Sequence, residues 1–209
     1  METKTKNKCL TNLVTFSNIK LGGKIPQLNM PYLTSCRDDA PCKKECYCTH
    51  GNMAFKIVRD SHMEKYELYK ANPVAFFNRI DAELEFADHK YFRWHSSGDI
   101  VDEQYLERMC WLARRHKKTM FLCFTKKYEL VNEYLNHHKK PANLTIVLSN
   151  WGDWTVENPH NLPESYVDFG NNDHNLPLFA YECPGRCEEC NGQHCFHMQK
   201  GQAVVFHKH

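Results

Sequence analysis

Two short runs of cysteine constrain this chain more than any other feature of its sequence. Eight of the eleven cysteines fall in SCRDDAPCKKECYC and CPGRCEECNGQHC, one run near each end of the 209-residue chain. A chain of this length can bury a core without disulfides, and an odd number of cysteines cannot pair completely. Residues 1–8 are polar and lysine-rich with no apolar stretch behind them, so we expect no secretory signal and a reducing, cytoplasmic compartment. The clustered thiols are therefore predicted to bind metal, in preference to forming a disulfide knot.

The spacing of the C-terminal run favours an iron–sulfur cluster over zinc. Structural zinc sites usually join two C-x2–4-C pairs through a loop of a dozen or more residues. This run is one unbroken C-x3-C-x2-C-x4-C, which is closer to the compact ligation of a cubane cluster. We predict a 4Fe–4S cluster with zinc as the alternative, and the ligands would be Cys183, Cys187, Cys190 and Cys195. His194 and His197 flank the last cysteine and could hydrogen-bond sulfide or replace a ligand, although surface histidines are commoner.

The N-terminal run has the spacing C-x5-C-x3-C-x-C. We predict Cys36, Cys42 and Cys46 as ligands and leave Cys48 undecided, because only a bent chain brings both members of a C-x-C pair to one cubane. Three thiolates leave one iron open to a substrate, whereas four normally make an electron carrier or a structural element. Seven ligands could serve one cluster or two. The three remaining cysteines are assigned no chemistry: Cys9, Cys110 and Cys123.

The middle of the chain alternates apolar helices with short strands. Helical spacing of apolar residues predicts helices over 53–71, 73–86, 102–116 and 127–135, and Asn72-Pro73 suits a helix start. Apolar runs predict strands over 91–95, 120–124 and 144–148, with two more over 176–181 and 203–207. This β-α-β-α-β order predicts an α/β fold with a short, partly barrel-like parallel sheet.

We expect residues 1–209 to form a single domain with four parts. Residues 1–17 are expected to be peripheral, and residues 53–150 to form the helix and strand scaffold. The cysteine segments 18–52 and 176–209 are expected to close over the carboxyl ends of the strands. In parallel α/β folds, ligands bind at that end of the sheet.

Polar residues follow each predicted strand of the scaffold. The sets are HSSGD after the first strand, Thr125-Lys126 after the second and SNW after the third. We predict His95, Ser97 and Asp99 as catalytic residues that hold a small polar substrate. The alternative is that Ser97 to Asp99 only cap the next helix. Lys126 is expected to be a solvated loop charge.

Composition and missing motifs exclude several classes of function. Lys+Arg 27 against Asp+Glu 25 gives a net charge of +2, which makes a nucleic-acid partner improbable. No apolar run approaches the ~20 residues of a membrane helix. The sequence has no G-x-G-x-x-G and no G-x-x-x-x-G-K-[ST], so nucleotide binding by those motifs is unsupported. The expected partners are a small-molecule substrate and an electron donor.

Five segments in fixed order resemble the phage gene product 88-like proteins. They are NIKLGGKIPQLNMPYLTSC, CKKECYCTHG, RWHSSGD, MFLCFTK and the cysteine run before VVFHKH, so the resemblance spans Asn18 to the end. It implies a cytoplasmic protein of a phage-infected bacterium with an iron–sulfur centre, whose ligands would be the seven cysteines named above. A more distant likeness is to radical S-adenosylmethionine enzymes, whose usual C-x3-C-x2-C spacing differs from C-x5-C-x3-C in this chain. S-adenosylmethionine as a cofactor is therefore the weaker implication.

Three functional hypotheses remain open from the sequence. The leading one is an iron–sulfur enzyme whose open iron acts on a small substrate by redox, radical or sulfur-transfer chemistry. The second is a non-catalytic electron carrier in which Cys48 completes the first cluster. The third is a zinc-stabilised binding module.

Overall fold

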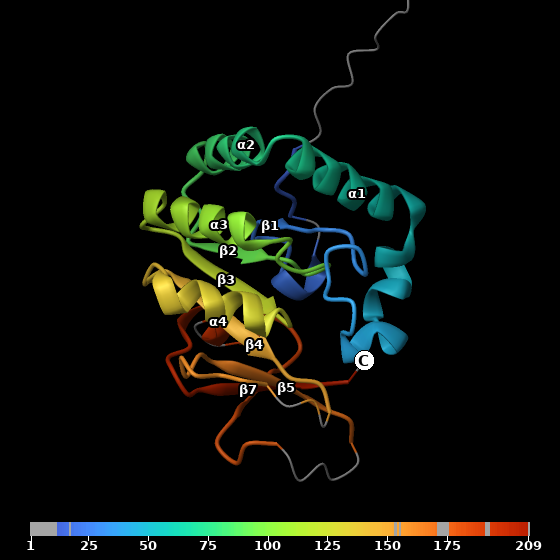
Figure 1. The fold of residues 1–209 in the computed structure, drawn as a ribbon. Helices are drawn as coiled ribbons and strands as arrows, with labels where there is room; N and C mark the ends of the chain where they lie inside the picture. The colour runs from blue at the N-terminus through green and yellow to red at the C-terminus, as the bar shows by residue number, and fades with distance from the viewer. Residues whose placement is uncertain are drawn as a thin grey trace, which may run out of the picture.

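The fold is built around one wholly parallel sheet of seven strands in the order β1-β2-β3-β4-β5-β7-β6. The computed structural model describes residues 12–16, 18–152, 154, 156–170, 176–190 and 193–208 (Figure 1). The strands are β1 Gln27–Leu28, β2 Tyr91–Trp94, β3 Met120–Thr125, β4 Leu144–Ser149, β5 Glu164–Asp168, β6 Tyr181–Glu182 and β7 Ala203–His207. The predicted α/β class with a parallel sheet is confirmed, as an open sheet that is wider than expected.

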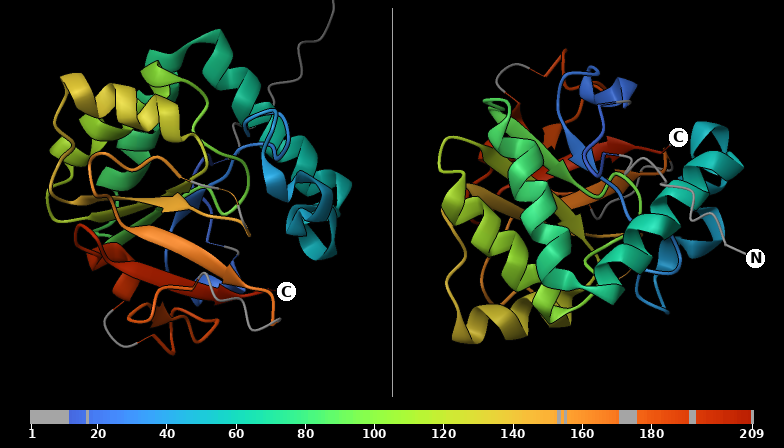
Figure 2. Two further views of the ribbon diagram at one scale, coloured as in Figure 1. Left: turned by 60° about the horizontal axis from the view of Figure 1, so that its bottom comes forward. Right: turned by 90° about the horizontal axis from the view of Figure 1, so that it is seen from above.

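Four helices lie against one face of this sheet (Figures 1 and 2). They are α1 Lys56–Ala71, α2 Pro73–Glu85, α3 Glu103–Arg115 and α4 Tyr128–His137, and each packs against the next along the chain. All four match the predicted helices closely. The shorter 3-10 helices are η1 Ile19–Leu21, η2 Pro41–Glu45, η3 Tyr47–Thr49, η4 Gly51–Ala54 and η5 His194–His197. None of the helices in the described ranges has the length and apolar character needed to cross a bilayer.

The alternation of side chains along the strands divides the core into two layers. Trp94 and Phe121 point to the helical face and join one large apolar cluster. Leu122 and Val147 point to the opposite face, where they pack against Phe196 from the C-terminal cysteine segment. The second face of the sheet is thus covered by segments from the two ends of the chain, η1 and the region around η5, in place of helices such as those on the first.

Two strands were missed and one was misplaced by the sequence prediction. β1 has only two residues, and β5 contains Glu164 and Asp168, so neither forms an apolar run. The strand predicted over 176–181 is a turn instead, in which the Ala180 amide donates to the Pro177 carbonyl. Pro177 has no amide hydrogen to give a sheet, and only Tyr181 of the predicted range belongs to β6.

The start of α2 gives a first test of the fold. Asn72 Oδ1 accepts the Ala75 amide at 2.9 Å, and Pro73 occupies the first turn of the helix. The substitution Asn72→Ala removes this cap, and we expect it to lower the free energy of unfolding by about 1 kcal/mol. Urea denaturation measures the loss, and Asn72→Asp should stay close to wild type because it keeps the acceptor. Equal losses in the two variants would contradict a capping role.

Candidate metal centre

The N-terminal cysteine segment lies across the carboxyl ends of the strands. The Tyr47 hydroxyl donates to the Ser96 carbonyl just beyond β2, and Arg37 Nη1 donates to the Lys126 carbonyl at 3.0 Å just beyond β3. At the far side, Lys208 Nζ lies 2.6 Å from a carboxylate oxygen of Glu45, next to the end of β7. The segment between β1 and α1 is therefore held over the end of the sheet where the sequence predicted a site.

All three predicted N-terminal ligands lie within electrostatic range of one ammonium group. The charges of Cys36, Cys42 and Cys46 all interact with Lys126, whose Nζ donates to Ser149 Oγ at 2.7 Å. Burial lowers the pKa of Lys126, while Cys42 and then Asp99 act in the opposite direction. Burial also raises the pKa of the Cys36 thiol to about 11 and that of Cys42 above its usual value. Lys126 is thus only partly exposed and sits among the thiols, which corrects the expectation of a solvated loop charge.

Cys48 lies beside Cys46 and is almost fully buried, with 2% of its surface exposed. A hydrogen bond from the Cys48 thiol, together with weaker effects, lowers the pKa of Cys46 to about 6. The same interaction, with burial, raises the pKa of Cys48. The Ser97 hydroxyl, which donates to the Met30 carbonyl at 3.1 Å, also adjoins the Cys48 thiol. Cys48 is therefore a buried hydrogen-bonding neighbour of Cys46.

The four predicted C-terminal ligands form a second group. Each of the four interacts electrostatically with others of the set, which consists of Cys183, Cys187, Cys190 and Cys195. Cys190 Sγ accepts the His194 amide at 3.3 Å and lies 3.3 Å from the Tyr181 hydroxyl. Burial raises the pKa of Cys195 to about 12. The backbone turns between the first two cysteines at Gly185, whose φ of 94° suits glycine.

The C-terminal group lies on the second face of the sheet, which corrects the expectation that both segments close over the strand ends. Cys183, Cys187 and Cys195 pack against the apolar layer that contains Leu122 and Val204. The Cys187 amide donates to the Lys20 carbonyl at 2.8 Å, which ties this segment to η1. The N-terminal group therefore lies at the carboxyl ends of the strands, and the C-terminal group lies on the second face of the sheet.

Arg93 of β2 adjoins two cysteines of the C-terminal group and Tyr47 of the N-terminal segment. Its Nε is buried and has no hydrogen-bond partner among the described residues, and its guanidinium carbon lies 4.1 Å from the centre of the Phe124 ring. Burial lowers the pKa of Arg93, and the neighbours that oppose this are Cys123, Tyr47, Cys195 and Cys187. These neighbours are thiols and a phenol, which are neutral at their ordinary pKa values, so they do not compensate the charge of this half-buried guanidinium.

The three predicted catalytic residues have different surroundings. Asp99 accepts the Thr125 hydroxyl at 2.6 Å and the Lys126 amide at 2.9 Å, and its charge interacts with Cys36. Burial raises the pKa of Asp99 although these bonds favour its charged form. The cap of α3 is Asp102, which accepts the Tyr105 amide, so Asp99 is not a helix cap. Asp99 positions the start of the loop that carries Lys126.

His95 is turned toward the helical side of the sheet. Its Nε2 lies 3.0 Å from the Tyr105 hydroxyl and its Nδ1 lies 3.8 Å from Cys123 Sγ. Only 4% of its surface is exposed, and burial lowers its pKa to about 3. Ser97 is equally buried and contacts Cys48, as described above. Ser97 and Asp99 thus adjoin the N-terminal thiols, whereas the described contacts of His95 lie elsewhere.

Several residues of this site were not predicted from the sequence. Arg37 joins the cysteine segment to α4 through Glu129, with Nη1 3.0 Å from the carboxylate. The Ser35 hydroxyl donates to the Pro31 carbonyl and accepts the Asp99 amide. Both residues adjoin Cys36 in the sequence, and this proximity was the only signal that could have identified them.

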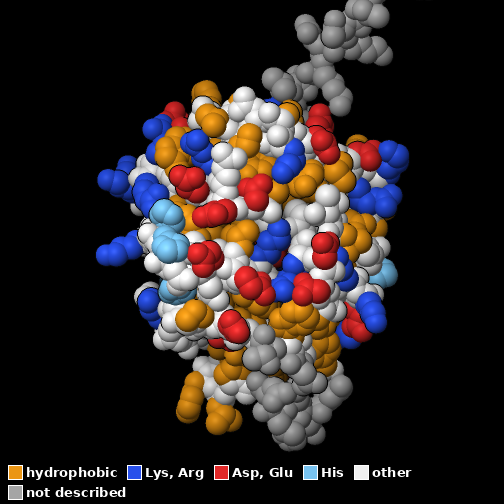
Figure 3. All heavy atoms as spheres, viewed as in Figure 1, with side chains coloured by type: hydrophobic (Ala, Val, Ile, Leu, Met, Phe, Trp, Pro, Cys, Tyr) orange, Lys and Arg blue, Asp and Glu red, His pale blue; other side chains and the backbone are white. Residues whose placement is uncertain are grey.

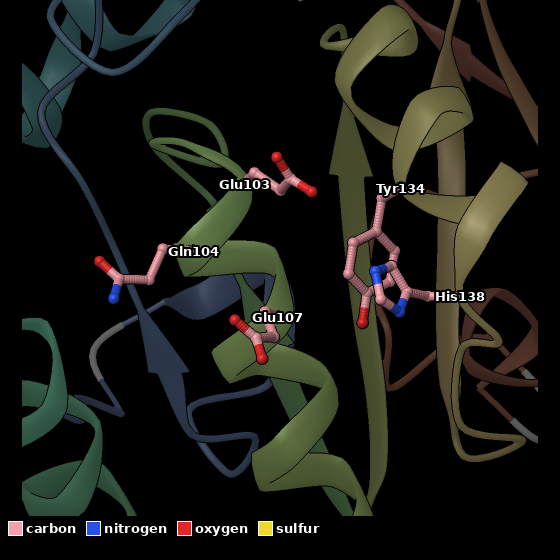
Figure 4. Close-up of a pocket in the computed structure, with 5 residues that line it drawn as sticks. All are labelled: Glu103, Gln104, Glu107, Tyr134 and His138. Carbon is pink, nitrogen blue, oxygen red and sulfur yellow. The ribbon is translucent and has the colours of Figure 1, made fainter.

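One cavity lies away from both cysteine groups. It has a volume of about 330 Å³ and lies between α3 and α4, with Glu103, Gln104 and Glu107 on one side and Tyr134 and His138 on the other (Figure 4). The Tyr134 and His138 rings stack with their centres 4.6 Å apart. Around it, acidic and basic side chains are interspersed on the face shown in Figure 3. None of the five lining residues is a predicted site residue.

Within the described ranges, no three His, Cys, Asp or Glu side chains are arranged to share one metal ion. This observation concerns a single ion. A cubane cluster binds each thiolate on a different iron, so its ligand sulfurs are spread more widely. The two cysteine groups offer thiol donors only, which is the donor set of iron–sulfur clusters and of soft metals.

Comparison with known proteins gives one match. The sequence pattern of a family described as gene product 88 matches residues 1–172. No curated protein and no solved structure matches. The match includes Cys36, Cys42 and Cys46 but ends before Cys183, so the family resemblance reaches less far than the sequence suggested. The description names neither an iron–sulfur cluster nor S-adenosylmethionine.

Proposed function

Because this chain belongs to the gene product 88 family of phage proteins, whose description names no activity, we propose its function from its own residues. The protein is an iron–sulfur protein in which Cys36, Cys42 and Cys46 hold a 4Fe–4S cluster with one open iron. The C-terminal cysteines hold a second thiolate centre. The open iron acts on a small molecule in the infected bacterial cell, with an electron donor as partner.

One observation carries the proposal: each cysteine group faces a cation that burial disfavours. Lys126 lies among the N-terminal thiols, and Arg93 adjoins Cys187 and Cys195. The thiols beside Arg93 are neutral at their ordinary pKa values and do not compensate its charge, which is costly for a half-buried cation. Lys126 has partial compensation from Asp99 and from the acidic thiol of Cys46. Thiolates bound to iron are negative, so clusters at these two places would supply the missing charge. The pairing of one cation with each group supports metal-bound thiolates over a set of free thiols.

The surroundings of Cys48 favour three ligands over four at the first cluster. Its thiol is in hydrogen-bonding contact with Cys46, and 2% of its surface is exposed. A cubane binds its ligand sulfurs on separate irons, so the Cys48 thiol would have to give up its hydrogen bond with Cys46 to become a fourth ligand. This arrangement supports an open iron, and it disfavours the electron carrier in which Cys48 completes the cluster.

The residues around the thiols have separable roles. The cluster, when bound, supplies a Lewis-acidic iron and one-electron chemistry. The ammonium group of Lys126 lies near the thiols, and its hydrogen bond to Ser149 Oγ fixes its position. Asp99 fixes the Lys126 backbone, and the Leu33 amide donates to Cys36. Hydrogen bonds and charges of this kind set the potential of a cluster. His95, Ser97 and Asp99 remain predictions as residues that touch the substrate.

The test is anaerobic purification of the full chain with analysis of iron and sulfide and EPR spectroscopy of the reduced protein. We expect a brown protein whose first cluster signal is lost in Cys36→Ala, Cys42→Ala and Cys46→Ala. Cys48→Ala should keep that signal, and Cys110→Ala should keep it too because Cys110 is a buried core residue. Addition of a small molecule that binds the open iron should shift the EPR spectrum.

Two results would overturn this proposal. A colourless protein with stoichiometric zinc would replace both clusters by a zinc-stabilised module. Loss of the first cluster in Cys48→Ala, with no loss in Cys110→Ala, would indicate four ligands and an electron carrier.

A further inference from the structure

A second cavity lies on the other side of the turn that leads to Cys36. It has a volume of about 230 Å³ and is bounded by residues 31–34 and by Arg59, His62 and Met63 of α1. The three helix residues are spaced at i, i+3 and i+4, so they share one face. Clefts for drug-sized ligands measure ~300–1,000 Å³, so this one suits a smaller molecule.

His62 is the unusual group in this cavity. Only 5% of its surface is exposed, and its Nδ1 is buried without a hydrogen-bond partner among the described residues. Burial, with a smaller effect from Lys65, lowers the pKa of His62 to about 4, so the ring is neutral near pH 7. Because Nδ1 has almost no accessible surface, a ligand in the cavity would reach the ring at its other nitrogen, which can donate a hydrogen to a ligand oxygen when the ring is neutral.

The other lining groups define the kind of ligand. Arg59 is exposed and supplies the only formal charge among the lining residues, in a geometry that matches a carboxylate. Leu33 and Met63 are 41% and 38% exposed and offer apolar surface beside it. One cation, one neutral hydrogen-bonding ring and two apolar side chains suit a ligand with one negative charge and an apolar body.

We propose that this cavity binds a small organic monocarboxylate. Arg59 and His62 hold the carboxylate oxygens, and the apolar body packs against Leu33 and Met63. A doubly charged phosphate fits less well, because the lining offers one cation only.

The cavity and the thiol group share the same turn. Leu33 has a φ of 65°, which is unusual for a residue with a side chain, and it is the residue whose amide donates to Cys36. A ligand that contacts the Leu33 side chain is therefore expected to perturb the Leu33 amide, which lies beside Cys36. Only the effect of this change on a cluster rests on the proposed function, since binding itself needs no metal.

The test uses the full-length chain labelled with ¹⁵N and titrated with 4-methylpentanoate. We expect saturable shifts of the His62 ring and of the Leu33 amide in NMR spectra. Loss of the charged hydrogen bonds in Arg59→Gln should weaken binding about tenfold or more. His62→Leu should weaken it as well, whereas Lys117→Gln, at an exposed lysine beyond α3, should leave it unchanged.

The uncharged 4-methylpentanamide and inorganic phosphate serve as ligand controls and should bind much more weakly. The proposal fails if no saturable shift occurs at His62 and Leu33, if the amide binds as well as the acid, or if Arg59→Gln binds like wild type. Because Arg59 is exposed, its variant remains informative even if His62→Leu does not fold. None of these outcomes depends on the presence of iron.

Discussion

Replacement of Gly98 by alanine is expected to destabilise the protein by about 3 kcal/mol or more. Gly98 follows β2 and has a φ of 78°, which residues with a side chain rarely adopt. An added Cβ would lie 2.6 Å from the Met30 carbonyl oxygen and 2.5 Å from Ser35 Oγ. The first of these is backbone that cannot rotate away, so the turn that leads to Cys36 would have to move.

Gly170 provides a matched control for this prediction. Its φ is 77°, almost the same as that of Gly98, but an added Cβ would meet nothing within 4 Å. Gly170→Ala should therefore lower the free energy of unfolding by about 1–2 kcal/mol, which is the cost of placing alanine in a left-handed backbone conformation. Urea denaturation of both variants separates this cost from the clash. Equal decreases in the free energy of unfolding would show that the close approach of Gly98 to Met30 does not add to the destabilisation.

His95 is expected to make the protein sensitive to acid. Burial lowers the pKa of His95 to about 3 in the folded protein, against about 6.5 in an unfolded chain. As the pH falls, the unfolded chain binds the proton first, so the folded state loses stability between about pH 6.5 and about pH 3. The stability that depends on a neutral His95 is fully present above about pH 6.5. Its complete loss at low pH should lower the free energy of unfolding by a few kcal/mol.

The variant His95→Asn isolates this effect. Asparagine tolerates the left-handed backbone that His95 adopts, with a φ of 54°, and it does not titrate. Urea denaturation at about pH 7 and about pH 4 should show a smaller loss of stability in the variant than in wild type. His62 acts in the same direction in both proteins and cancels from the comparison. An identical loss in the two proteins would mean that His95 is protonated without cost in the fold.

The helices and the central strands could be predicted because their signals are local. The apolar spacing around Met109 and the continuous run of Met120–Thr125 each lie within one element, and Asn72-Pro73 marks a helix start by itself. β5 could not be found in this way. It is held by pairing with β7, from Glu164 with Ala203 to Asp168 with His207, and this partner lies far away in the sequence.

The site was predictable in its donors and not in its surroundings. Closely spaced cysteines identify a thiol group without knowledge of the fold. Lys126 reaches Cys42 only because β1, β2 and β3 are neighbours in the sheet, and no local pattern records that order. The position of the C-terminal group also has a local signal in the sequence. Phe196 and Met198 follow Cys195 closely and are buried, which ties that segment to an apolar face.

The two shortest strands lie at the two sides of the sheet. β1 and β6 have two residues each, and the longer strands are all enclosed between them. A long exposed outer strand presents free amides and carbonyls that a second copy of the chain can pair with. The sheet of this protein presents very few of them within the described ranges, although it is rich in apolar residues. The arrangement disfavours aggregation through strand addition.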